Sequence, residues 1–155
     1  MLKSFDKILE PDPRFQSMAL ANHHEIVASI LLNGNPPDDV RKAFDRARNL
    51  MLYAYFYYEM LVNAEIQAFG AFELALRIKL NGTPKQTLQI LVDRARKEGV
   101  LPKLNAGHQM DSINGMIKLR NELSHGTSSV HSPPMAETVL EFCGAMIDII
   151  FPKIP

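Results

Sequence analysis

The sequence has few of the features that cross-link a small protein. Its 155 residues include one cysteine and no tryptophan, so a disulfide framework and a cysteine-rich zinc site are both excluded. A single cysteine also fits a reducing compartment. Neither sign of charge dominates, because 17 Lys and Arg residues balance 17 Asp and Glu residues to a formal net charge of +0. This balance argues against a protein that coats nucleic acid through its overall charge, so any such contact must be local.

Long hydrophobic runs are also missing. The longest apolar stretch lies between Asn49 and Glu59, which is far short of the roughly 18 residues that a helix needs to cross a bilayer. The chain reaches Asp6 before any apolar segment, unlike a secretory signal peptide. We therefore expect a cytoplasmic protein with no membrane partner, and about one domain that is large enough to bury its own core.

Apolar residues recur at helical spacing along most of the chain, and no stretch alternates with a period of two. Clusters of Pro, Gly and Asn divide the helical stretches from one another. The sequence predicts an all-α bundle of about five helices with a long central helix. An irregular lead-in over residues 1–14 precedes a single helical domain over 15–155. The predicted helices span residues 15–32, 37–80, 83–99, 108–124 and 133–151.

The predicted second helix, 37–80, is the longest. Its residues 50–62 are apolar on nearly every side, which indicates burial on most sides. An unbroken helix of this length would span ~60 Å, more than the radius of a small domain, so we expect a kink at Asn63 or Gly70, or a ridge between two subunits. The aromatic run 53–58 favours core or dimer interface over a platform for stacking bases.

The helix 108–124 carries an arginine, Arg120, in the middle of its apolar arc. A guanidinium is rarely buried unless it is paired, because its desolvation costs several kcal/mol. Arg120 therefore either reaches water or a structural ion pair, or points into a cleft or subunit interface to bind an anion. Glu65 and Glu73, both on the predicted second helix, are the carboxylates that could orient it. Glu73 can also pair with Arg77 one turn later.

A histidine follows this arginine after five residues, at the predicted end of the helix. The segment reads Arg120-Asn121-Glu122-Leu123-Ser124-His125. Histidine moves protons near neutral pH and arginine stabilises negative charge, so the pair suits metal-free chemistry on a phosphodiester. No set of carboxylate, His or Cys residues has the spacing of metal ligands. We therefore expect neither a metal nor another cofactor.

This segment resembles the motif of the HEPN superfamily, whose all-α domains carry R-x4-6-H, commonly with Asn, Asp or His after the arginine. Asn121 and the four-residue spacer match, and the segment 72–77 resembles the acid-bearing helix that many members place upstream. The resemblance covers about residues 38–151. It implies a homodimer that brings two motifs together and, in many members, a metal-independent endoribonuclease, with toxins and phage-defence proteins among them. Arg120 and His125 would be catalytic, and Asn121 would hold the phosphate or the other subunit's motif.

Two observations limit what the resemblance implies about partners. Toxins paired with a nucleotidyltransferase antitoxin carry a tyrosine two residues after the motif histidine, whereas this chain has Thr127. A cognate antitoxin would therefore not act through that tyrosine. The densest basic patch, Arg94, Arg96 and Lys97, is either a solvated helix end or a surface that guides RNA.

Two classes of function follow. The complete motif favours an endoribonuclease acting on single-stranded RNA. The zero net charge favours a noncatalytic helical module that binds a nucleotide or a protein. Cys143, on the apolar side of the last helix, is expected in the core rather than as a nucleophile.

Overall fold

The computed structural model describes residues 2–103, 111–126 and 128–154. Within these ranges the chain forms six α-helices and two short 3₁₀ helices, in agreement with the helical periodicity of the sequence. No strand occurs within these ranges, and the all-α prediction is confirmed. The α-helices are α1 (Leu20–Ser29), α2 (Asp38–Tyr53), α3 (Met60–Lys79), α4 (Leu88–Lys97), α5 (Ser112–Ser124) and α6 (Pro133–Ile150). None of these six is both long and apolar enough to cross a bilayer.

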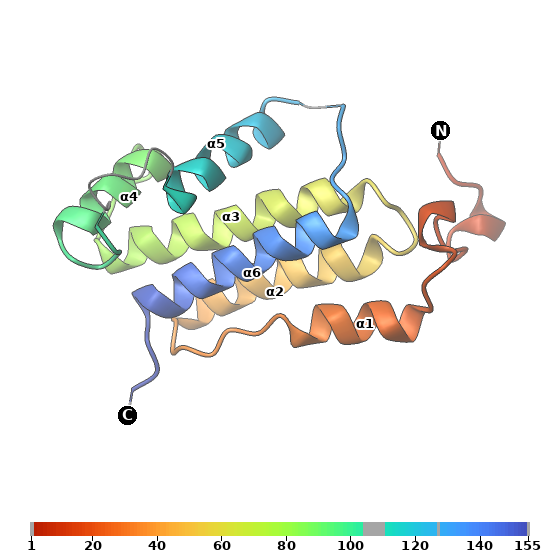
Figure 1. Cartoon of the computed structure of the whole chain (residues 1–155), viewed down its shortest axis with the longest axis horizontal. Coiled ribbons are helices and arrows are strands. Elements are labelled where there is room, and N and C mark those ends of the chain that lie inside the picture. The colour runs from red at the N-terminus through yellow and green to blue at the C-terminus, as the bar shows by residue number, and fades with distance from the viewer. Residues whose placement is uncertain (1, 104–110, 127, 155) are drawn as a thin grey trace.

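The core lies where α3 packs against α2 and α6 (Figure 1). Small side chains let these helices approach closely, and large aromatic side chains fill the space between them. Ala47 on α2 and Ala68 on α3 are buried, as are Phe44, Phe69 and Phe72. Helix α1 packs on α2, while α4 and α5 contact α3 and each other. The central helix is therefore α3, which is the second half of the long helix that the sequence predicts.

The prediction of one helix over 37–80 is wrong, because the chain turns back at residues 54–59. Helix α3 runs unbroken through Asn63 and Gly70, so neither residue marks the break. Tyr55 lies in the turn, with its backbone oxygen accepting from Asp12 N at 2.8 Å and its hydroxyl donating to Met18 O at 2.9 Å. Folding back lets the apolar faces of α2 and α3 bury each other, which a ~60 Å rod could not achieve within one subunit.

The lead-in is more regular than predicted. It contains the 3₁₀ helices Phe5–Lys7 and Pro13–Phe15, and this second one takes up the start of the predicted first helix, so α1 begins only at residue 20. The side chain of Asp12 caps Pro13–Phe15 by accepting from Arg14 N at 3.1 Å. The ring of Phe15 is buried against His23 and Tyr55. These contacts fix the lead-in to the turn between α2 and α3.

The remaining helix ends follow local signals. Helix α4 begins after Thr87, whose hydroxyl accepts from Ile90 N at 3.4 Å, four residues later than the predicted cap. Gly99 has a φ of +74° just beyond α4, as expected of a glycine that ends a helix. Helix α5 is capped by Asp111, and its predicted start at residue 108 lies outside the described residues.

Candidate functional site at the end of α5

Helix α5 places Arg120 beside α3. Its buried residues Ile113, Ile117 and Leu123 hold one face of α5 against the body of the protein. The side chain of Arg120 lies at the edge of that face and is 35% exposed. Its Nη2 atom is 3.5 Å from Oε2 of Glu73 on α3. Arg120 therefore has a carboxylate partner and still reaches solvent.

Glu73 forms ion pairs with two guanidinium groups. Its Oε1 atom accepts a hydrogen bond of 2.5 Å from Nη2 of Arg77, one turn later on α3. Its Oε2 atom faces Arg120 at the longer distance of 3.5 Å. Two positive charges and one negative charge thus meet where α3 contacts α5, and the cluster keeps one positive charge that can attract an anion. Glu73 therefore accounts for both pairings that the sequence left open.

Asn121 orients the other side of the Arg120 guanidinium. Its Oδ1 atom accepts from Nη1 of Arg120 at 3.2 Å. The planar fork of Arg120 is thus held by an amide on one nitrogen and by a carboxylate on the other. Such a held fork suits a phosphate, which needs two donors in fixed positions.

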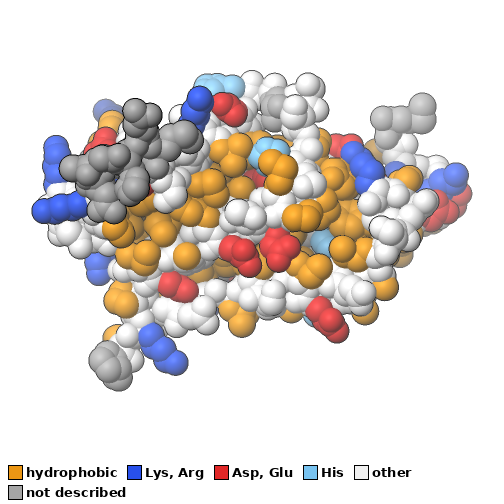
Figure 2. Space-filling model, in the orientation of Figure 1, with side chains coloured by type: hydrophobic (Ala, Val, Ile, Leu, Met, Phe, Trp, Pro, Cys, Tyr) orange, Lys and Arg blue, Asp and Glu red, His pale blue; other side chains and the backbone are white. Residues whose placement is uncertain are grey.

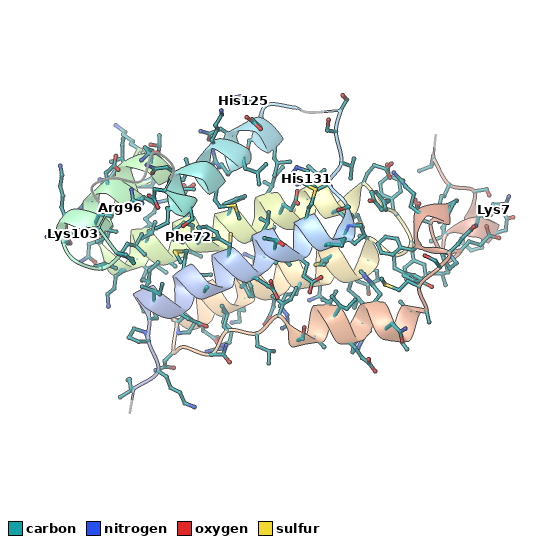
Figure 3. All side chains as sticks on the ribbon, in the orientation of Figure 1. Lys7, Phe72, Arg96, Lys103, His125 and His131 are labelled. Atoms are coloured by element: carbon teal, nitrogen blue, oxygen red, sulfur yellow. The ribbon has the colours of Figure 1, made fainter. Side chains whose placement is uncertain are left out.

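His125 ends α5. Its backbone N–H donates to Asn121 O at 3.1 Å, and Gly126 follows with a φ of +80°. The imidazole is exposed and stands at the outer end of α5 (Figure 3). Within the described ranges no hydrogen bond or ion pair joins it to Arg120. Arg120 lies within α5 and His125 directly follows its last residue, so a group bound by both side chains would have to bridge them.

Glu65 does not reach Arg120. It is fully buried on α3, and its Oε1 atom lies 2.8 Å from Nδ1 of His131, which precedes α6. Burial raises the pKa of Glu65, and its contact with His131 opposes part of that rise. Cys143 is buried in the core, and burial also raises the pKa of its thiol, with a further contribution from Glu65.

Sequence reasoning missed this Glu65–His131 pair. An acid on an apolar helix face must find a partner, and that signal was visible in the sequence. His131 lies 66 positions further along the chain, so only the packing of α6 on α3 could identify it.

The predicted RNA contacts on α4 differ in their surroundings. Arg96 is 7% exposed and pairs with Asp111 and, at 3.3 Å, with Oδ1 of Asn114. This buried arginine joins α4 to α5, which leaves it poorly placed to guide RNA. Arg94 pairs at 2.7 Å with Glu98, the residue that directly follows α4.

Lys97 is exposed on the surface of α4. Figure 3 shows Arg96 and Lys103 at the α4 end of the molecule, apart from His125. In Figure 2 the basic side chains gather mainly toward the two ends of the face in view, with apolar and acidic side chains across its middle.

Among the residues that the structure describes, no three His, Cys, Asp or Glu side chains are grouped closely enough to hold a metal ion. Thr127, which stands at the tyrosine position of the modified toxins, lies outside the described residues. No family model matches the chain, and neither a curated protein nor a solved structure matches it significantly.

Proposed function

We propose that this protein is a metal-independent endoribonuclease that cleaves single-stranded RNA, with Arg120 and His125 as catalytic residues in a homodimer. The observation that carries the proposal is the held guanidinium of Arg120. Glu73 and Asn121 orient it, it is 35% exposed, and the exposed imidazole of His125 stands about one and a half turns further along the same helix. An anion-binding group and a proton-transfer group thus both reach solvent near the C-terminal end of α5.

The reaction needs no group beyond these side chains and the RNA. The ribose 2′-oxygen attacks the adjacent phosphorus while neutral His125 accepts the 2′ proton. The bond from phosphorus to the 5′-oxygen breaks, and that oxygen takes a proton from the protonated His125 of the second subunit. Arg120 stabilises the additional negative charge on the five-coordinate phosphorus. The products are a 2′,3′-cyclic phosphate and a free 5′-hydroxyl.

The direct test compares His125→Ala with His24→Ala on a labelled single-stranded RNA. His24 is an exposed histidine on α1 and serves as the matched control. We expect His125→Ala to lower the cleavage rate by roughly 10² to 10⁴, the usual contribution of general acid–base catalysis, with an unchanged circular dichroism spectrum. His24→Ala should cleave as the wild type does.

The proposed reaction predicts three further results in the same assay. EDTA should leave the rate unchanged, RNA with 2′-O-methyl groups should not be cut, and Arg120→Ala should be inactive. Cleavage that persists undiminished in both His125→Ala and Arg120→Ala would contradict the proposal. Growth arrest on expression that His125→Ala abolishes would support a role as a toxin or defence protein.

A noncatalytic nucleotide- or protein-binding module is the second candidate, and one observation favours it. Glu73 already neutralises part of the Arg120 charge, and no hydrogen bond joins Arg120 to His125 among the described residues. Under this alternative the wild type would bind a nucleotide or RNA in an Arg120-dependent way and would cut no RNA. Product analysis alongside binding measurements separates the two candidates.

A further inference from the structure

Two arginines share one carboxylate where α3 contacts α5. Nη2 of Arg77 lies 2.5 Å from Oε1 of Glu73, and Nη2 of Arg120 lies 3.5 Å from Oε2 of the same side chain. Helix α5 lies along α3 in Figure 1, so side chains from both helices can meet at Glu73. Among the residues that the structure describes, no other ion pair joins this cluster, named here the Arg77–Glu73–Arg120 triad.

Arg77 supplies the excess positive charge of the triad. Glu73 and Arg120 alone would form a neutral pair, and a neutral pair exerts little attraction on an anion at a distance. With Arg77 ionised as well, the triad carries one positive charge more than negative. The Arg120 site therefore attracts a phosphate only because a second arginine stands beside the same carboxylate.

The triad is partly buried and still open to solvent. The side chains of Arg77, Glu73 and Arg120 are 26%, 18% and 35% exposed. Salt screens such half-buried charges less than it screens fully exposed ones. Both arginines retain enough exposed surface for a ligand to reach them.

Most of the donors in the triad remain available. A guanidinium has five N–H donors, and Glu73 accepts from one nitrogen of Arg77 and from one of Arg120. The 3.5 Å contact of Arg120 is longer than the usual N–H···O distance of about 2.7–3.2 Å. Arginine binds carboxylates and phosphates through the same fork of two parallel hydrogen bonds, so a phosphate can take the place that Glu73 holds.

We propose that Arg77 is a second phosphate-binding residue of this site, and that Glu73 competes with the bound phosphate for both arginines. The ligand is a phosphodiester group of single-stranded RNA, and in this identification the inference rests on the proposed function. Arg77 acts on binding, whereas Arg120 also stabilises charge during the reaction. In the cleavage assay Arg77→Gln should therefore raise KM more than it lowers kcat.

Binding of a fluorescent 2′-O-methyl RNA, measured by anisotropy, tests the inference without cleavage. Arg77→Gln should weaken binding roughly tenfold or more, the usual effect of losing a hydrogen bond to a charged group. The logarithm of its dissociation constant should also depend less steeply on the logarithm of the salt concentration, by about 0.7 for one lost phosphate contact. Arg77→Lys keeps the charge and should keep the wild-type salt dependence.

Glu73→Gln gives the sharper result, because it should improve binding. Removing the competing carboxylate leaves two unpaired positive charges, so the RNA should bind more tightly and with a steeper salt dependence than in the wild type. The double variant Arg77→Gln/Glu73→Gln returns the site to one positive charge and should bind close to the wild type. A loss of folding cannot produce either a gain in affinity or such a recovery.

Arg48→Gln is the matched control. The side chain of Arg48 is 23% exposed and pairs at 2.8 Å with Asp45, one turn earlier on α2. Its Nε atom is buried without a hydrogen-bond partner among the described residues, as is that of Arg77. No second arginine pairs with Asp45 in the described part of the chain, so this pair is neutral and Arg48→Gln should bind RNA as the wild type does.

Three results would overturn the inference. They are a wild type that does not bind the 2′-O-methyl RNA, an Arg77→Gln protein with wild-type affinity and salt dependence, and a Glu73→Gln protein that binds more weakly. In the last two cases the triad would only fasten α5 to α3.

The cleavage assay separates this inference from the proposed function. Binding that follows the expected order while unmodified RNA stays uncut would count against catalysis alone. Cleavage with an unchanged KM in Arg77→Gln would count against the role of Arg77 alone.

Discussion

Replacing Asp12 with Asn should remove the ion pair between Asp12 and Arg14, which lies within the lead-in beside the turn between α2 and α3. The Asp12 side chain is 9% exposed and receives hydrogen bonds from Nε and Nη2 of Arg14 at 2.8 and 3.0 Å. It also accepts from the backbone N–H groups of Arg14 at 3.1 Å and of Tyr58 at 3.4 Å. Asparagine keeps an oxygen that can accept from the backbone, so the substitution removes mainly the ionic part.

The size of this effect follows from the pKa of Asp12. Its hydrogen bond with the Arg14 guanidinium lowers that pKa from an ordinary value of 3.8 to about 2. A shift of this size corresponds to about 2 kcal/mol of folding free energy when Asp12 is ionised. Because the folded-state pKa is below the unfolded one, the contribution is complete above pH 4 to 5 and is lost as the pH falls through about 2.

Urea unfolding of both proteins from pH 7 down to pH 2 measures the prediction. At pH 7 we expect Asp12→Asn to be less stable by about 2 kcal/mol, and the difference should shrink toward zero as the pH falls from 4 to 2. Glu59→Gln is the control, because Glu59 is the more exposed partner of Arg14 and such pairs contribute about 0–1 kcal/mol. A difference that stays constant with pH would refute the reasoning, since it would then come from packing or capping.

Two further predictions concern stability at neutral pH. Arg96→Ala should destabilise the fold by about 3 kcal/mol, because it breaks a buried pair between α4 and α5. Arg94→Ala removes a partly exposed pair and should cost less than about 1 kcal/mol. Equal losses of stability in urea unfolding would argue against a structural role for Arg96. Gly34→Ala should destabilise by about 2 kcal/mol or more, because its Cβ would lie 2.2 Å from a backbone oxygen of the C-terminal segment. Gly115→Ala lies in α5 with nothing within 4 Å of the added Cβ, so it should instead stabilise the fold by about 0.5–1 kcal/mol. Melting temperatures of Gly34→Ala and Gly115→Ala that shift in the same direction would contradict this contrast.

Local sequence signals were enough for the fold class and for several helix ends. The spacing of apolar residues identified the helices, and α6 spans Pro133–Ile150 where 133–151 was predicted. Gly99 ends its segment with a positive φ, as its position indicated. These features depend on neighbours within about one turn, which is why the sequence contains them.

The break between α2 and α3 could not be located in the same way. No proline and no glycine mark residues 54–59, and their apolar character is compatible with a helix. The turn depends instead on Asp12 and Met18, which hold Tyr55 from positions about 40 residues away. A helix propensity summed along the chain contains no term for such contacts.

The same distinction between local sequence and tertiary packing applies to the candidate site. The sequence by itself determined that Arg120 must be paired or reach water, because a guanidinium on an apolar arc is rarely buried alone, and it offered Glu65 and Glu73 as the carboxylates that could orient it. Only the tertiary structure decided that Glu73 contacts Arg120 and that Glu65 contacts His131. The two acids are eight residues apart on α3, so both lie near one face, and the position at which α5 and α6 pack along that face selects the partner of each.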